Sequence, residues 1–178
     1  MPFTTYHFGP ALLLGVLLFP FLDVTTLMVA SVVLDLEPLA VLVLGLPIPL
    51  HGFFHTYLGA TIVALVLSAI IWPFRAYLNQ FISLFGLHQK SNSRHIILAS
   101  LIGTNFHVFL DSFLYMEMNP FYPLLGNPFL SLLTSSLVYT SCVLVAILGL
   151  IVYLIRIFYS FQGSKDNQMG QNTSARID

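Results

Sequence analysis

The chain alternates long apolar runs with short polar interruptions, a pattern that predicts helices folding back and forth across a bilayer. The first two runs, residues 8–22 and 24–34, are short: at about 1.5 Å per residue neither comfortably crosses a hydrocarbon core of about 30 Å. We therefore expect a short N-terminal helical hairpin, for which partial insertion is at least as plausible as two full spans. Asp23, between the two runs, is expected to cap the second helix.

Three longer apolar runs follow, and each is predicted to form a transmembrane helix. They cover residues 57–72, 95–114 and 129 to roughly 158. Pro73 is expected just beyond the end of the first of them, because proline disrupts a helix interior. The predicted fold class is thus all-α, a polytopic membrane helical bundle with a short hairpin and three longer transmembrane helices.

The polar and turn-rich segments between these runs predict connections. Residues 35–50 are apolar but broken by Gly45, Pro47 and Pro49, which indicates a buried or interfacial connection. From residue 162 the chain is rich in Gly, Ser, Asn and Gln, as is typical of disordered segments. We expect one membrane-embedded domain over residues 1–161 and a disordered polar cytoplasmic tail over 162–178.

Composition supports a membrane protein and excludes several other classes. Hydrophobic residues make up 57% of the chain and charged residues 7%, with a mean hydropathy of +0.90, whereas about a quarter of residues are charged in soluble domains. A net charge of −1 argues against a nucleic-acid partner. No Lys or Arg precedes Arg75, so the apolar start is expected to be mature structure rather than a signal peptide. Cys142, the single cysteine, cannot form an intrachain disulfide.

The distribution of cations predicts the orientation in the cell membrane. All six Lys and Arg lie in residues 74–94 or from Arg156 onward, and two predicted spans separate these regions. Both regions therefore face one side, which the positive-inside rule makes cytoplasmic, as it does the C-terminus. The outer face then receives His51 with His55, Asp111 and Glu117.

Two pairs of polar side chains with a spacing of four residues suggest metal chemistry. His51 and His55 share one face if their segment is helical, and His107 and Asp111 repeat the spacing. Imidazole and carboxylate together suit zinc and similar divalent metals. Ionisable groups are costly in a membrane, so several of them near one leaflet indicate a functional site. One histidine taken alone is better explained as an interfacial residue bonded to a loop carbonyl, and Asp35, Glu37 and Glu117 could simply be solvated.

The motifs also carry a resemblance to a known family. After an early histidine, the chain reads Asp35-Leu36-Glu37-Pro38, then His51-Gly52-Phe53-Phe54-His55-Thr56, then Gly103-Thr104-Asn105-Phe106-His107-Val108-Phe109-Leu110-Asp111, then Asn119-Pro120-Phe121-Tyr122-Pro123. This order resembles the predicted membrane-bound metal-dependent hydrolases, the YdjM-like inner-membrane family. That family usually has Arg after the first histidine of the second motif, where this chain has Gly52. The third motif is also similar to a metal-binding helix of zinc-dependent phospholipases C.

The resemblance implies a hydrolase that uses a metal-activated water on an ester or phosphoester, including that of a lipid. The orientation predicted from the cations puts this activity at the outer membrane surface. Glu37 or Glu117 would supply a spare carboxylate for general base catalysis. Six ligands exceed one tetrahedral zinc, so one or two divalent ions, zinc foremost, are expected. The expected metal ligands are His7, Asp35, His51, His55, His107 and Asp111.

A non-enzymatic function remains the alternative. The same residues could belong to a metal-binding or structural membrane protein, or to a subunit that lends a polar pocket to a partner. A transporter is less favoured, because its ionisable groups would lie at the membrane midplane rather than near one surface. The sequence does not define the oligomeric state, and its expected partners are the lipid bilayer and the substrate.

Overall fold

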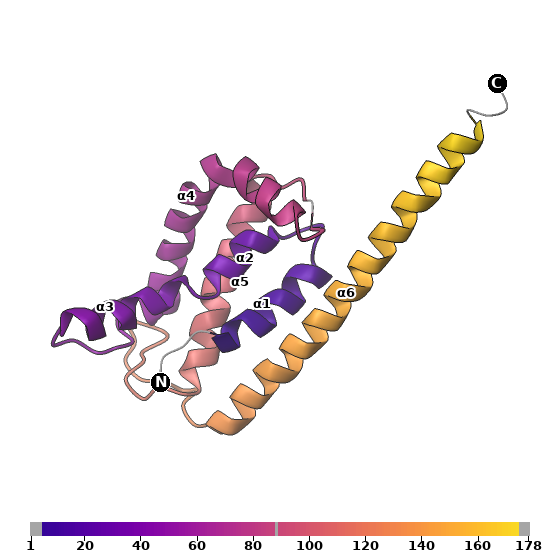
Figure 1. Cartoon of the computed structure of the whole chain (residues 1–178). Coiled ribbons are helices and arrows are strands. Elements are labelled where there is room, and N and C mark those ends of the chain that lie inside the picture. Colours follow the sequence, from indigo (N-terminus) through magenta and orange to yellow (C-terminus); the bar gives the residue numbers. More distant parts are fainter. Residues whose placement is uncertain (1–4, 88, 175–178) are drawn as a thin grey trace.

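The computed structural model describes residues 5–87 and 89–174, and it is all-helical over these residues (Figure 1). This confirms the expected fold class. The elements in chain order are α1 (Thr5–Leu17), α2 (Val24–Ala30), η1 (Val33–Asp35), α3 (Leu36–Leu44), η2 (Phe53–His55), α4 (Tyr57–Ser83), α5 (Ser93–Ser112) and α6 (Ser135–Ser174), where η marks a 3-10 helix.

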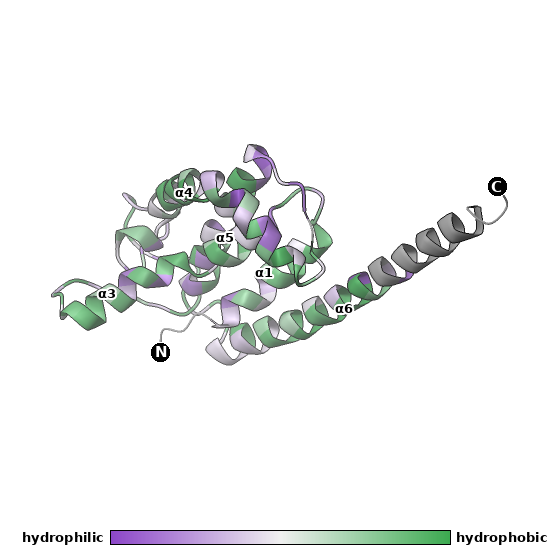
Figure 2. Cartoon of the chain, turned by 45° about the horizontal axis from the view of Figure 1, so that its top comes forward, coloured by the Kyte–Doolittle hydropathy of each residue, from purple (hydrophilic) through white to green (hydrophobic). Residues whose placement is uncertain are grey.

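Three stretches are long and apolar enough to cross a membrane, which supports membrane association. Among the described residues these are Val24–Leu44, Tyr57–Ser83 and Ser135–Tyr159. Figure 2 shows hydrophobic residues along much of α6. The expected span over 95–114 corresponds to α5, which is 20 residues long but is not among the three. Its Ser, Thr, Asn, His and Asp side chains make it the polar helix of the bundle.

The N-terminal hairpin forms, but its second arm does not end short at residue 34 as expected, because α2, η1 and α3 together make the candidate span Val24–Leu44. Its first arm, α1, has only 13 residues, and the chain then turns into α2. Asp23 is the N-cap of α2, and its carboxylate accepts a hydrogen bond from the Thr26 backbone N–H at 2.7 Å. The predicted cap is therefore confirmed, and α2 and η1 return the chain toward the end of the bundle where α1 begins.

The connection predicted over residues 35–50 contains a helix, α3, which the sequence analysis missed. Pro38 lies in the first turn of α3, where a missing N–H is tolerated because the first helical N–H groups have no partner within the helix. Gly45 ends α3 with a φ of 63°, a left-handed conformation that glycine adopts readily. Gly45, which was expected to interrupt an irregular connection, therefore marks the end of a helix instead.

Two helix boundaries also differ from the prediction. Pro73 lies inside α4, which continues to Ser83. The last helix begins at Ser135 rather than at residue 129, because Phe129 folds back and packs against the rings of Phe109 and Phe113. At its other end α6 continues to Ser174, beyond the expected start of the tail at residue 162. The division into a domain and a disordered tail stays a prediction.

α5 occupies the centre of the bundle and packs against α2 and α4 (Figure 1). A Cβ at Gly103 would lie 2.6 Å from the Cβ of Ala30, so only glycine permits this approach of α5 to α2. At the opposite end from the N-terminus, buried Gln89 donates hydrogen bonds to the Phe19 and Leu22 carbonyls and accepts one from the Val24 N–H at 3.1 Å. This side chain fixes the hairpin turn to the loop before α5.

Candidate metal centre

Four histidines point their Nε2 atoms at one carboxylate, that of Asp111 near the end of α5. Its Oδ2 lies 3.2 Å from Nε2 of His107, 3.9 Å from that of His55 and 4.0 Å from that of His51. Its Oδ1 lies 3.1 Å from Nε2 of His7. Asp111 is 2% exposed, so this convergence occurs in a nearly dry environment.

Asp35 supplies a second carboxylate on the same side of the molecule. Its Oδ1 lies 3.7 Å from Nε2 of His107. Ligand atoms of Asp35, His55, His107 and Asp111 all lie within 4.8 Å of one another, close enough to hold a metal ion. His7, whose ring stacks on that of His107 with centroids 4.0 Å apart, joins the group from α1. The structure thus brings all six expected ligands together, including the hairpin pair His7 and Asp35.

The outer nitrogens of three histidines are each held by an acceptor. His55 Nδ1 lies 2.7 Å from Glu37 Oε2, His51 Nδ1 lies 2.8 Å from Glu117 Oε1, and His107 Nδ1 lies 2.8 Å from the Ser31 carbonyl oxygen. Carboxylates and carbonyls only accept, so each Nδ1 carries the proton and donates. A ring bonded in this way directs its Nε2 toward the centre, an arrangement typical of metal-binding histidines.

The donor set fits a divalent metal ion. Within the described residues, the buried Nε2 atoms of His55 and His107 and Oδ2 of Asp35 have no hydrogen-bond partner, although buried polar atoms normally have one. Ligands of a tetrahedral zinc at about 2.0–2.1 Å lie roughly 3.3 Å apart, and the two shortest nitrogen–oxygen distances at Asp111 are 3.1 Å, to His7, and 3.2 Å, to His107. A cation bound between these atoms would give the unpartnered nitrogen and oxygen atoms the partner that they lack.

His51 and His55 reach this geometry without lying on one face of an α-helix, the arrangement that their spacing of four residues suggested. His51 precedes a 3-10 helix, η2, which ends at His55, and α4 begins only at Tyr57. The two rings still come together, with centroids 4.8 Å apart. A Cβ at Gly52 would lie 2.7 Å from Glu37 Oε1, so glycine between the histidines lets the glutamate reach His55.

The two glutamates expected to act as a base lie behind the imidazoles rather than among the central groups. Glu37 contacts both His55 Nδ1 and the Phe54 N–H, the latter at 3.3 Å, and its side chain is 11% exposed. Glu117 is more open, with 37% of its side chain exposed. Both orient histidines in the structure, whichever further function they have.

The protonation preferences of two groups suit a cation site. Burial lowers the pKa of His55 below its ordinary value, by more than the Glu37 hydrogen bond raises it, so the ring is neutral near pH 7. Partial burial alone would raise the pKa of Glu117, but the hydrogen bond from His51 holds it below its usual range. A neutral imidazole beside an ionised carboxylate is the state in which both serve a metal.

Two contributors escaped the sequence analysis. Ser31 accepts the His107 hydrogen bond through its backbone carbonyl, and a pattern of side chains in the sequence cannot predict such a contact. Tyr115 stacks on His51 with ring centroids 3.8 Å apart and an interplanar angle of 23°. Its backbone N–H donates to the Asp111 carbonyl, so its spacing of four residues from Asp111 could have indicated a place beside the cluster.

Fold and site together define a class: an all-helical protein with apolar helices long enough to span a membrane and a buried His/Asp cluster that could hold a metal ion. Comparison with known proteins does not narrow this class, since no family model matches the chain and neither a curated protein nor a solved structure matches it significantly.

Proposed function

We propose that this protein is a membrane-bound metal-dependent hydrolase of esters or phosphoesters. One observation carries the proposal: three imidazoles, each with its outer nitrogen held, aim Nε2 at the Asp111 carboxylate. Zinc is the ion we favour, since imidazole and carboxylate are its usual ligands in hydrolases. Each oxygen of Asp111 lies near a different histidine nitrogen, so the carboxylate could serve one ion or bridge two.

When bound, such an ion supplies a Lewis acid and lowers the pKa of a coordinated water. The residues of the protein would bind the ion, orient its ligands and supply the base. His55, His107, Asp35 and Asp111 would hold the ion, while Glu37 holds the His55 ring in position. Of the two glutamates, Glu117 is the better candidate for the general base, because its side chain is more exposed and can be reached by water and substrate.

The position of the cluster supports action at the outer membrane surface. α4 begins beside His55 and ends at Ser83, and α5 returns from Ser93 to Asp111, so the cluster lies at the end of the bundle opposite the cationic segment 75–94. By the positive-inside rule the cluster then faces outward. The motif order, which resembles that of predicted membrane-bound hydrolases, bears on the activity and not on this orientation.

The alternative is a metal-binding or structural membrane protein without catalysis. The near-complete burial of His55, His107 and Asp111 favours it, because a structural ion needs no access for substrate. Metal-loaded protein that hydrolyses no carboxyl ester, phosphomonoester or phosphodiester would support this alternative over the hydrolase.

Elemental analysis of metal per protein tests the site itself. We expect bound metal in protein purified without a His-tag, and a loss of most of it in His107→Ala and Asp111→Asn. His95→Ala is the matched control, since His95 lies on α5 at the other end of the bundle. Background metal in wild type, with no refilling by added zinc or manganese, would overturn both the site and the hydrolase.

A further inference from the structure

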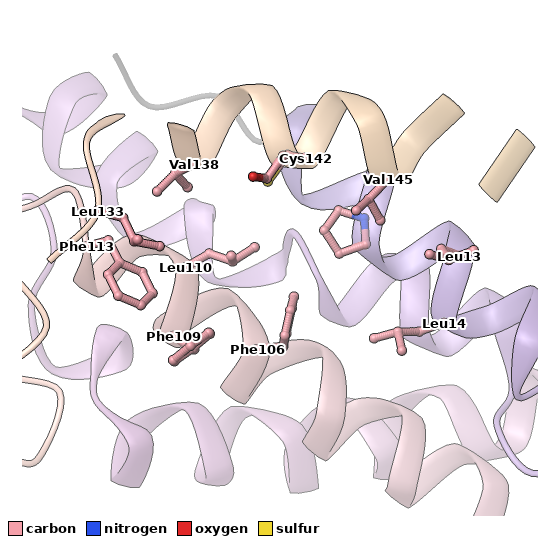
Figure 3. A pocket seen from close by; sticks show the side chains of 12 residues that line it. Leu13, Leu14, Phe106, Phe109, Leu110, Phe113, Leu133, Val138, Cys142 and Val145 are labelled. Carbon is pink, nitrogen blue, oxygen red and sulfur yellow. The ribbon is translucent and has the colours of Figure 1, made fainter. Parts of the chain in front are cut away.

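A cavity of about 310 Å³ lies between α1, α5 and α6 (Figure 3). Figure 3 shows α5 contributing Phe106, Phe109, Leu110 and Phe113 on one side, with Val138, Cys142 and Val145 of α6 facing them. The volume falls in the range of about 300–1,000 Å³ that is usual for ligand pockets. This side of α5 is not the side that presents His107 and Asp111 to the cluster.

The side chains that line the cavity favour a hydrocarbon ligand. Apart from Ser141 and Cys142, the side chains that line the cavity are apolar, so a charged or strongly hydrated ligand would be desolvated there without compensation. One wall belongs to α6, whose stretch Ser135–Tyr159 is a candidate membrane span with only 11% of its window buried. In a membrane the medium beside this wall is therefore lipid, which supplies the occupant.

The cavity is adjacent to the metal cluster. A small crevice of about 10 Å³ is lined by Leu14 and Phe106, which also line the cavity, and by His7 and His107. Along α5 the cavity extends from Phe106 to Phe113, about 10 Å at about 1.5 Å per residue, and Asp111 lies within this stretch. A chain in the cavity would thus run beside the cluster at the same depth.

We propose that this cavity binds an acyl chain of a membrane phospholipid whose phosphate group reaches the metal cluster. The inference rests on the proposed function. Without a bound cation, the carboxylates of Asp35 and Asp111 would repel a phosphate group. Phe113 and Val138 lie toward the end of the bundle where α5 stops and α6 starts, so the lipid ester lies there. The chain's methyl end lies toward Leu14, Phe106 and Val145.

Photocrosslinking with phosphatidylglycerol in proteoliposomes tests the assignment. One lipid carries a diazirine near the ester of its acyl chain, and another carries it at the chain end. We expect peptide mapping to place the chain-end label on Phe106 and Leu14 and the ester-proximal label on Phe113 and Val138. Labels confined to the exposed face of α6, or found in the reverse order, would overturn the proposal.

A matched pair of variants on α6 provides the control. Val145 lines the cavity, whereas Val143 is 45% exposed on the outer surface. We expect Val145→Trp to lower labelling of the α5 residues about fivefold or more, since it overfills the cavity, and Val143→Trp to leave labelling nearly unchanged. Equal labelling in the two variants would contradict an acyl site. The mapping in wild type decides the question even where Val145→Trp fails to fold.

Metal analysis of the same preparations separates this inference from the proposed function. Labelling in the expected order with background metal would retain the acyl cavity and remove the hydrolase. Bound metal without labelling of the cavity would retain the metal centre and remove the phospholipid.

Discussion

Glu37 shows how a residue outside the central group can control it. Its carboxylate bonds to His55 Nδ1 and to the Phe54 N–H, so it fixes both a ring and the backbone of η2. Residues that orient a metal-binding histidine in this way are worth about 10–100-fold in metal affinity. Its role here follows from geometry rather than from residue type.

We therefore expect Glu37→Gln to weaken zinc binding by about 10–100-fold without preventing membrane insertion. Glu117→Gln should weaken it less, because that side chain is 37% exposed and water can replace its bond to His51, whereas the Glu37 side chain is 11% exposed. Competition with a zinc chelator on the purified proteins measures both affinities. A larger loss in Glu117→Gln than in Glu37→Gln would contradict this ranking.

The sequence reveals which side chains meet, but not how each of them acts. His7, Asp35 and Asp111 could be predicted as partners because ionisable groups are rare in apolar runs and a hairpin brings two of them together. The acceptors behind the rings could not be predicted, since they depend on ring orientation. Glu37 was therefore taken for a base, and the Ser31 carbonyl was missed.

At the scale of elements, Gln89 joins parts of the fold that are remote in sequence. It satisfies the Phe19 and Leu22 carbonyls and the Val24 N–H at the turn between α1 and α2. A turn between two short arms leaves such backbone groups without helical partners. One buried amide supplies both the donors and the acceptor that the turn needs.

Gln89→Leu should lower the free energy of unfolding by at least about 2 kcal/mol, because it leaves buried backbone groups unsatisfied. Thermal unfolding in detergent measures the loss. Gln80→Leu is the matched control, since Gln80 is exposed near the end of α4. Equal melting temperatures for the two variants would show that the bonds of Gln89 contribute little.

Element boundaries were less predictable than the number and length of apolar runs. Pro73 was expected just beyond the end of a helix, yet it lies within α4. The effect of a proline depends on its position in the helix and on its neighbours, and neither is visible locally. The 3-10 helix at His55 was missed because its spacing mimics an α-helical face.

At the scale of the whole molecule, the ends of the bundle are expected on opposite sides of the membrane. Leu84, 79% exposed, follows α4 at the cationic end, and Leu125, 83% exposed, lies in the loop after α5 at the cluster end. In a Cys142→Ala background, Leu125→Cys should react with an impermeant maleimide in intact cells. Leu84→Cys should react only after permeabilisation, and the opposite pattern would place the cluster on the cytoplasmic side.

The long sequence separation of its contacts has a consequence for how this protein is made. Gln89 lies 65 residues from its partner Val24, and His107 lies 76 residues from Ser31. The hairpin is therefore synthesised well before Gln89 and α5, and its contacts with them can form only after these later residues have been made. The proposed metal centre closes only after Glu117 has been synthesised, so metal retention would also report that a chain has completed its assembly.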